Sequence, residues 1–343
     1  MPLRLWKNNM KHYNIPIFVP HNGCPNDCSF CNQKRITGHA HVPDAPEVYQ
    51  EVEKHLKTLE ADRYVEIAFF GGSFTGIEEE KQRELLSAAS SFIQNGEVDG
   101  IRLSTRPDYI TPHVLDYLKD YGVTAIELGV QSMDDEVLKK NNRGHTAADV
   151  EKAARLINSY GCFQLGLQQM LGLYGSSQEK DFETAVKIAA LSPQVTRIYP
   201  TVVLEGTHLF DLYMKGKYIP FTVEQAVETG SKIYELYTEN GIRVIRMGLQ
   251  ATEVINEKDE KMYGPYHSSY GELVKSRVLR TRLEKQLNGL TGEVVVLANP
   301  RLVSKLVGNK RCNVLYFKKK LGITLIVKPD PSVEEFSINV TKI

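Results

Sequence analysis

The residues with the clearest chemistry are three cysteines near the N-terminus. Cys24, Cys28 and Cys31 stand in a CxxxCxxC spacing. Four-iron, four-sulfur clusters are held by cysteine thiolates, normally four of them, so three cysteines leave one iron without a protein ligand. That open iron can chelate the amino and carboxylate groups of S-adenosylmethionine. The spacing therefore predicts such a cluster, with S-adenosylmethionine as a second cofactor.

This pair of cofactors indicates radical chemistry. An electron passed from the cluster to the sulfonium would break its bond to the ribose carbon, and the resulting deoxyadenosyl radical abstracts hydrogen from a substrate. Phe30, between the last two cysteines, is expected to pack on the adenine ring. Cys162 and Cys312 stand alone and are expected to be ordinary thiols.

The alternative is a structural zinc site. In that case His21, His39 or His41 would complete a tetrahedron with the three cysteines. Zinc sites usually take their cysteines in pairs from two separate places, whereas here all three thiols lie in one loop. We therefore prefer the cluster.

A glycine-rich turn, at Gly71, Gly72 and Ser73, follows the second predicted strand. Two glycines at a strand end let backbone carbonyls approach a ligand closely, so this turn is predicted to bind the methionine ammonium of the cofactor. Read alone, a pair of glycines is equally consistent with a tight bend after a strand.

Polar residues also follow the third and fourth predicted strands. At the mouth of a barrel these strand ends would form a ring for ribose hydroxyls and a carboxylate. We assign Gln131 to the ribose, with Thr105 beside it, and expect Arg106 and Arg143 to clamp a carboxylate or phosphate. For either arginine alone, the alternative is a surface ion pair.

The elements that must position these residues alternate between short β-rich runs and amphipathic helical stretches, which is typical of a parallel sheet. The predicted strands are residues 15–20, 65–71, 100–105, 125–130, 163–168 and 197–204, with a further one at 243–249. The predicted helices are residues 48–59, 79–94, 112–121, 147–160, 178–191 and 223–240. We expect an α/β fold, a partial (β/α)6 barrel of the TIM type.

Length and composition indicate more than one unit. The 343 residues are 42% apolar, which is enough for one large core plus a small module. We predict a barrel domain at 1–251, a helical and loop extension at 252–288, and a small α+β module at 289–343.

The charge balance excludes a strongly basic or acidic protein. Lysine plus arginine and aspartate plus glutamate both number 42, so any contact with nucleic acid must be local. No segment reads as a secretory signal or as the run of ~20 apolar residues that a membrane span needs. The crowded cysteines do not read as a disulfide scaffold. We expect a cytoplasmic protein without membrane contact.

The predicted C-terminal module has the layout of a KH nucleic-acid-binding fold. A strand at 293–297, a helix at 300–307, a loop at 308–311, a helix at 312–321 and a strand at 323–327 follow one another. Lys310, Arg311 and Lys318 would contact the nucleic-acid backbone. The alternative, that the module docks on the barrel and exposes a solvated lysine face, stays open.

Several stretches together resemble a known family. They are TRPDY at 105–109, ELGVQS at 127–132, NRGHT at 142–146, and IYPT at 198–201 followed by Gly206-Thr207. In order and combination they resemble the radical S-adenosylmethionine half of the Elongator catalytic subunit and its bacterial relatives. The resemblance implies a barrel that binds S-adenosylmethionine and a four-iron cluster. In that family the enzyme modifies the wobble uridine of transfer RNA with acetyl-coenzyme A.

The chain departs from the family pattern in its shorter cysteine spacing and in the stretch after the fifth strand, residues 168–173. It also ends where the family's acetyltransferase domain would need well over a hundred more residues, so acetyl-coenzyme A is a doubtful cofactor. The segment at 264–270 resembles one in bacterial relatives without that domain. His267 within it is interpreted as a loop histidine, with an active-site role as the alternative.

We therefore expect a radical enzyme that modifies a nucleotide of RNA, with transfer RNA as its substrate and an external electron donor such as ferredoxin or flavodoxin. Two alternatives remain. One keeps the chemistry but acts on a small metabolite or peptide, and the other is a zinc-stabilised nucleic-acid-binding protein without catalysis.

Overall fold

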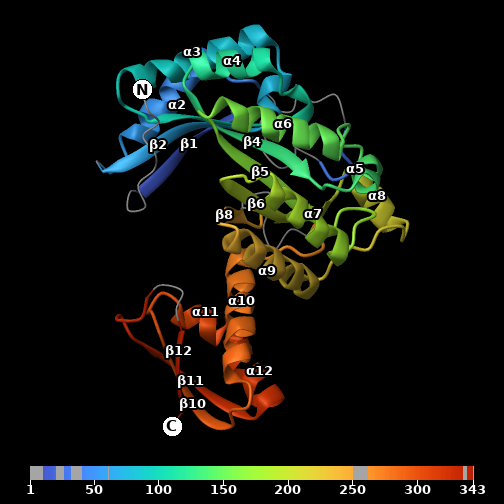
Figure 1. The fold of residues 1–343 in the computed structure, drawn as a ribbon. Coiled ribbons are helices and arrows are strands. Elements are labelled where there is room, and N and C mark those ends of the chain that lie inside the picture. The colour runs from blue at the N-terminus through green and yellow to red at the C-terminus, as the bar shows by residue number, and fades with distance from the viewer. Residues whose placement is uncertain are drawn as a thin grey trace.

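The computed structural model describes residues 11–20, 27–31, 41–60, 62–249, 262–334 and 338–342. A curved sheet of seven strands dominates it, in the order β1-β2-β3-β4-β5-β6-β8 (Figure 1). Every neighbouring pair is parallel. The strands are β1 (Lys11–Val19), β2 (Arg63–Gly71), β3 (Gly100–Thr105), β4 (Val123–Gln131), β5 (Gln164–Leu171), β6 (Val195–Pro200) and β8 (Arg243–Met247). The predicted partial barrel is thus confirmed.

Helices follow most of these strands and cover the outside of the sheet, as Figure 1 shows for α2, α3, α4 and α6. The helices of this part are α2 (Ala45–Leu56), α3 (Glu79–Gln94), α4 (Pro112–Asp120), α5 (Asp135–Lys140), α6 (Ala147–Tyr160), α7 (Gln178–Ala190), α8 (His208–Met214) and α9 (Val223–Glu239). Thr111 and Thr222 accept hydrogen bonds at the starts of α4 and α9, so two helices begin where their N-cap residues predict.

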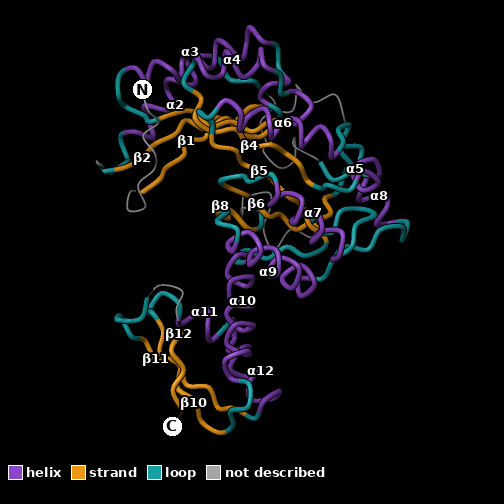
Figure 2. Tube along the Cα trace, viewed as in Figure 1, coloured by secondary structure: helices purple, strands orange, loops and turns teal. Residues whose placement is uncertain are grey.

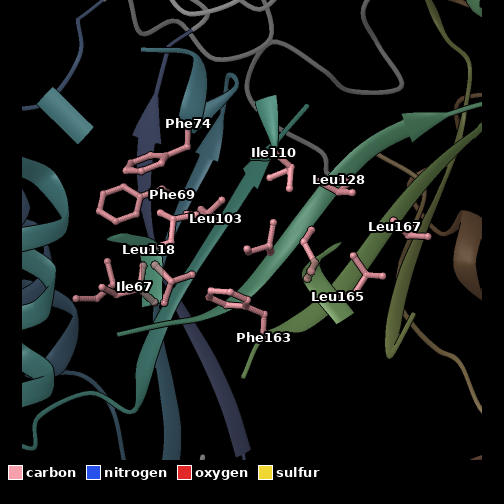
Figure 3. Close-up of a cluster of buried hydrophobic side chains, with 14 of the residues drawn as sticks. Ile67, Phe69, Phe74, Leu103, Ile110, Leu118, Leu128, Phe163, Leu165 and Leu167 are labelled. Carbon is pink, nitrogen blue, oxygen red and sulfur yellow. The ribbon is translucent and has the colours of Figure 1, made fainter. Parts of the chain in front are cut away.

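The main core lies between the sheet and these outer helices. Ile67 and Phe69 of β2, Leu103 of β3 and Leu165 of β5 belong to one buried cluster, together with Leu118 of α4 (Figure 3). All five are buried. Apolar side chains thus fix the sheet against its helices, and the opposite face of the strands is left to line the inside of the barrel.

One predicted strand is wrong in its extent. Residues 197–204 do not form a single strand, because β6 ends at Pro200 and a separate short strand, β7 (Val203–Leu204), pairs antiparallel with β9 (Met262–Tyr263). Proline has no N–H with which to continue the ladder. The chain therefore leaves the sheet there.

The C-terminal unit contains the predicted strand-helix-loop-helix-strand order and one further strand. Its elements are β10 (Gly292–Ala298), α11 (Val303–Val307), a 3-10 turn (Asn309–Arg311), α12 (Cys312–Leu321), β11 (Ile323–Pro329) and β12 (Ile338–Lys342). β10 lies in the centre of a three-stranded sheet, parallel to β11 and antiparallel to β12 (Figure 2). The strand β12 was not predicted.

A long helix, α10 (Tyr270–Leu287), joins the two units (Figures 1 and 2). Tyr270 and Val274 near its start pack with α9, whereas Leu283 and Leu287 near its end belong to the core of the C-terminal unit. The predicted division at 251/252 lies outside the described residues, and the three-part division stays a prediction. None of the described helices combines the length and apolar composition needed to cross a membrane.

Candidate functional site

A cavity of about 330 Å³ opens where the carboxyl ends of the barrel strands meet. All eight residues predicted to bind a cofactor line it, as do the two predicted cluster cysteines that the structure describes. These ten residues are Phe30, Gly71, Gly72, Ser73, Thr105, Arg106, Gln131, Arg143, Cys28 and Cys31. The third cysteine, Cys24, lies outside the described residues. Segments more than a hundred residues apart in sequence thus share one cavity wall.

The loop that carries the cysteines turns tightly between the two that are described. The backbone N–H of Cys31 donates to the carbonyl oxygen of Cys28 at 3.0 Å. Cys28 is buried, and Nη1 of the Arg143 guanidinium donates to its sulfur at 3.2 Å. A hydrogen-bond donor on the sulfur is a contact of the kind that orients a metal-binding cysteine.

Two asparagines hold this loop in place. The side-chain amide of Asn141 accepts from the hydroxyl of Ser29 at 2.7 Å, and its backbone carbonyl accepts from the Ser29 N–H at 3.1 Å. Asn142 donates to the carbonyl of Asp27 at 3.0 Å. Sequence reasoning singled out only Arg143 here. Asn141 is also the C-cap of α5, so in the sequence it could be read as no more than the end of a helix.

The glycine turn after β2 is packed tightly against the end of β1. Gly71 has φ +112°, and a Cβ there would collide with the ring of Phe18. A Cβ on Gly72 would lie 2.6 Å from the carbonyl oxygen of Pro20. Only glycine fits both positions. The backbone of this turn therefore forms the cavity wall directly.

Hydroxyl groups gather beside that turn. The Thr105 hydroxyl contacts those of Ser73 at 3.0 Å and Thr75 at 2.5 Å, and the Arg106 N–H donates to the Ser73 hydroxyl at 3.0 Å. The Arg106 guanidinium forms a fork with both carboxylate oxygens of Asp108, at 3.0 and 2.9 Å. It lines the cavity while already paired with a carboxylate of the chain.

Gln131 is the most unusual residue of the site. Its φ is +69°, which a non-glycine residue adopts at an energetic cost, and the register of β4 against β5 shifts just before it. Its buried Oε1 atom has no hydrogen-bond partner among the described residues. Strain and an unsatisfied buried oxygen together indicate a polar ligand at this position.

Arg143 lies opposite Gln131 across Gly129. One terminal nitrogen of the guanidinium donates to the Gly129 carbonyl, and its buried Nε has no partner within the described part of the chain. A Cβ at Gly129 would lie 3.0 Å from Nε2 of Gln131 and 3.2 Å from Nη2 of Arg143. The absence of a side chain there gives both polar groups access to the cavity.

The neighbouring His145 does not add charge to this region. Burial, followed by the nearby Arg143 and Arg106 cations, lowers the pKa of His145 to about 4. Its Nε2 lies 3.2 Å from the Val130 carbonyl, so Nε2 carries the proton and donates. The ring is neutral at physiological pH, and it supports the loop that carries Arg143.

The three basic residues predicted to bind nucleic acid lie elsewhere, exposed on the C-terminal unit. Lys310 and Arg311 both have positive φ, at +49° and +63°, directly before α12. The buried Asn313 fixes this loop to α10 by donating to the hydroxyl of Ser276 at 3.0 Å. The loop is therefore a defined surface, separate from the cysteine cavity.

The candidate ligands of the zinc alternative lie only partly among the described residues. Within these residues, no group of three or more histidine, cysteine, aspartate or glutamate side chains is arranged to hold a metal ion. His41 instead contacts the Glu47 carboxylate at 3.0 Å on the surface. His21 and His39 lie outside the described residues. His267 accepts from the Ser269 N–H and does not line the cavity.

Comparison with known proteins identifies two family models in the chain. The radical SAM superfamily matches residues 18–188, and the radical SAM C-terminal domain matches residues 193–280. Together they span the curved sheet from the end of β1 to β8, and the first part of α10.

Named relatives match parts of the same region. The tRNA uridine(34) acetyltransferase of Dehalococcoides mccartyi is 29% identical over 234 residues, which cover 58% of this chain and 50% of that protein. Elongator complex protein 3 of Homo sapiens is 31% identical over 192 residues, or 50% of this chain and 35% of that protein. The matches thus span half or less of these relatives' own length.

The fold is similar to that of a solved relative. The structure of Elp3 from the archaeon Methanocaldococcus infernus, with an N-terminal deletion, superposes with a TM-score of 0.62. The match covers 81% of this chain and 63% of that one, at 23% identity. The likeness therefore concerns the fold, and it covers most of this chain.

Proposed function

We propose, from the premise that the chain belongs to the radical S-adenosylmethionine superfamily, that it cleaves S-adenosylmethionine and modifies a nucleotide of RNA. The chain is an enzyme of that superfamily and resembles the Elongator catalytic subunit. The observation that carries it is the cavity in which two cysteines, the glycine turn, Gln131 and Arg143 meet.

The residues present fit both cofactors. Two thiols lie in one tight loop, and the Arg143 guanidinium donates a hydrogen bond to Cys28. Gln131 and Arg143 each have a buried polar atom without a partner among the described residues. Such atoms cost free energy unless a ligand satisfies them. A polar cofactor at this position would do so.

A four-iron cluster, when bound, would supply the electron for reductive cleavage of S-adenosylmethionine. Cys24, Cys28 and Cys31 would hold that cluster. An external donor such as ferredoxin or flavodoxin would reduce it.

The other residues bind and orient the second cofactor. The turn at Gly71 and Gly72 offers backbone carbonyls to its ammonium group, and the carboxamide of Gln131 accepts from a ribose hydroxyl. Thr105 and Ser73 complete the polar wall, and Arg143 faces the carboxylate. Phe30 excludes water on the adenine side; it packs with the apolar cluster of Leu209, Leu212 and Tyr218.

RNA is the proposed substrate for two reasons. The relatives reported above include an enzyme named for uridine 34 of transfer RNA. The C-terminal unit also presents a glycine-led basic loop, with Lys310 and Arg311, in the layout of an RNA-binding fold. We propose that this loop contacts the RNA backbone while the modified nucleotide enters the barrel.

Anaerobic reconstitution tests the chemistry. We expect the purified protein to take up iron and sulfide rather than zinc, and to form deoxyadenosine from S-adenosylmethionine under reduction. Cys24→Ala, Cys28→Ala and Cys31→Ala should each abolish that product, because a lost thiolate opens a second iron. Cys162→Ala is the matched control and should retain it. Deoxyadenosine formation by any of the three cluster variants would contradict the ligand assignment.

A comparison of transfer-RNA nucleosides from cells with and without the gene tests the substrate. We expect one modified nucleoside to be missing in the second. If the nucleosides are identical, and a small metabolite or peptide rather than RNA stimulates deoxyadenosine formation, the RNA proposal is wrong while the radical chemistry remains.

A further inference from the structure

One part of the wall of the cysteine cavity has no cofactor-binding role assigned to it. The residues assigned to the two cofactors come from the cysteine loop, from the ends of β2, β3 and β4, and from the loop that carries Arg143. The sheet continues past β4 with β5, β6 and β8 (Figure 1). Four further lining residues come from β5, β6 and the segment after β8, namely Gln168, Met170, Tyr199 and Leu249. This part of the wall is therefore available to a substrate.

Gln168 and Tyr199 lie in one block of side chains on the inner face of the sheet. Gln168 and Met170 are two residues apart on β5, so they point to the same face. Arg197 and Tyr199 have the same spacing on β6. Gln168 is paired in register with Arg197, and Met170 with Tyr199. Side chains at such positions on neighbouring strands are close enough to interact.

A buried carboxylate fixes the orientation of the Gln168 amide. Nε2 of Gln168 donates to Oε2 of Glu127 at 3.3 Å. Burial opposes the charge on Glu127, but Arg197 and Arg102 lower its pKa below the ordinary value. An ionised carboxylate can only accept hydrogen bonds, so the amide must turn its NH2 group toward Glu127. The carbonyl oxygen of Gln168 then faces away from Glu127, and no described residue donates to it.

The Tyr199 hydroxyl is oriented by the same buried ion pair. Nη1 of Arg197 donates to the hydroxyl oxygen at 3.4 Å, while Nε and Nη2 of Arg197 donate to Glu127. A guanidinium group cannot accept a hydrogen bond, so the hydroxyl hydrogen of Tyr199 must point elsewhere. Within the described part of the chain that hydrogen has no acceptor. The cavity wall thus offers one acceptor, on Gln168, and one donor, on Tyr199.

We propose that Gln168 and Tyr199 position the base of the substrate nucleotide, the Gln168 carbonyl accepting from an N–H of the base and the Tyr199 hydroxyl donating to the neighbouring acceptor. The Watson–Crick edge of a nucleobase carries a donor beside an acceptor, and enzymes that act on an extruded base read it by that edge. Met170 and Leu249 supply apolar contacts for the face of the ring. This assignment rests on the proposed function, since it takes RNA as the substrate.

Two single variants of the full-length reconstituted protein test the pair. Gln168→Leu removes the amide and Tyr199→Phe removes the hydroxyl, while Glu127 keeps both of its arginine partners in each variant. We expect both variants to bind S-adenosylmethionine and in-vitro transcribed transfer RNA within about twofold of the wild type. Deoxyadenosine formation at saturating transfer RNA should fall about tenfold or more, because the base is no longer held in one orientation.

Tyr160→Phe is the matched control. Tyr160 lies on α6 and does not line the cavity, and its hydroxyl donates to the Asp116 carboxylate at 2.8 Å. This variant loses a tyrosine hydroxyl, as Tyr199→Phe does, but it should keep the RNA-stimulated rate of the wild type. The melting temperatures of all three variants should lie close to that of the wild type, since the buried ion pairs of Glu127 stay intact.

Three results would overturn the positioning role. The first is a parallel loss of S-adenosylmethionine affinity, which would assign the two residues to the cofactor or to support of the cavity. The second is an RNA-stimulated rate equal to that of the wild type. The third is a loss of transfer-RNA affinity with an unchanged rate at saturation. If transfer RNA does not stimulate the wild type itself, the RNA substrate is wrong, and the positioning role is wrong with it.

Discussion

Gln131 combines a strained backbone with an unsatisfied side chain, and two substitutions separate these features, because they should differ in stability but lose cofactor binding equally. Gln131→Gly relieves the positive φ and should stabilise the protein by about 1 kcal/mol, whereas Gln131→Ala keeps the strain. Both variants remove the carboxamide, so both should bind S-adenosylmethionine about tenfold more weakly. Urea unfolding measures the first effect and equilibrium binding the second. Unchanged affinity in both would move the ribose contact to another residue.

Arg143 donates to the sulfur of a proposed cluster ligand, so it should tune the cluster. A cation that hydrogen-bonds a thiolate stabilises the reduced, more negative cluster. Arg143→Gln should therefore lower the reduction potential; about 1.4 kcal/mol of lost stabilisation corresponds to about 59 mV for one electron. A redox titration followed by electron paramagnetic resonance measures this shift. An unchanged potential with full iron content would show that the Arg143 contact to Cys28 is not maintained in the loaded enzyme.

The residues at the strand ends were largely predictable, because each polar side chain directly follows an apolar run that reads as a strand. Gln131 and the glycine turn are such cases. Asn141 was not predictable, since its role depends on contacts with Ser29, more than a hundred residues away in sequence. The faces of β8 also escaped prediction, because its bulge against β6 reverses the alternation from which strand faces are read.

The loop between α5 and α6 fixes the cysteine loop through hydrogen bonds from Asn141 and Asn142. Asn141 is fully buried and donates to the carbonyls of Val137 and Tyr174. Asn141→Ala leaves several buried polar groups unpaired, so it should lower the free energy of unfolding, measured in urea, by about 2–3 kcal/mol. It should also lower the iron content after reconstitution. Asn158→Ala, at an exposed site on α6, is the control and should change neither. Normal stability and iron content in Asn141→Ala would contradict the anchoring role.

The first turn of α7 contains a buried carboxyl, Asp181, with an unusual titration. Burial raises the pKa of Asp181 to about 7, although the Ser176 hydroxyl and the Gly172 N–H donate to it. The folded state therefore holds a proton that the unfolded state has released above about pH 4. Stability from this group is fully present below pH 4 and is lost as the pH rises toward 7 and beyond.

Asp181→Asn tests whether Asp181 causes this fall in stability with rising pH. The amide stays neutral, so the variant should lose the decline in stability between about pH 4 and 7. Urea unfolding at several pH values measures it. A variant whose decline over that interval equals that of the wild type would assign the titration to another group.

Most strands were predictable, and the exceptions have two different physical causes. Pro200 ends β6 early, and β7 leaves for a different pairing with β9, a partner almost sixty residues further on. The strand β12 was also missed. It adds to β10 from the far end of the unit, and a short run of this kind is decided by its partner rather than by its own pattern.

For the whole molecule, the barrel mouth and the basic loop should act on one RNA. Lys310→Glu/Arg311→Glu places four units of charge change at the loop and should weaken transfer-RNA binding at low salt by tenfold or more, with a shallower salt dependence. Lys54→Glu/Lys57→Glu makes the same change on α2 and is the control. Filter binding across several salt concentrations measures both. Equal loss in the two variants would indicate a diffuse charge effect, and no loss would remove the loop from RNA binding.

Helix α10 contributes to two hydrophobic cores, with Tyr270 and Val274 at one end and Leu283 and Leu287 at the other. One uninterrupted ladder of backbone hydrogen bonds therefore links them, and neither core can melt without exposing part of the helix that the other needs. Calorimetry should accordingly record a single cooperative endotherm. A helix-breaking proline at Ser276, midway between the cores, should split that endotherm into two.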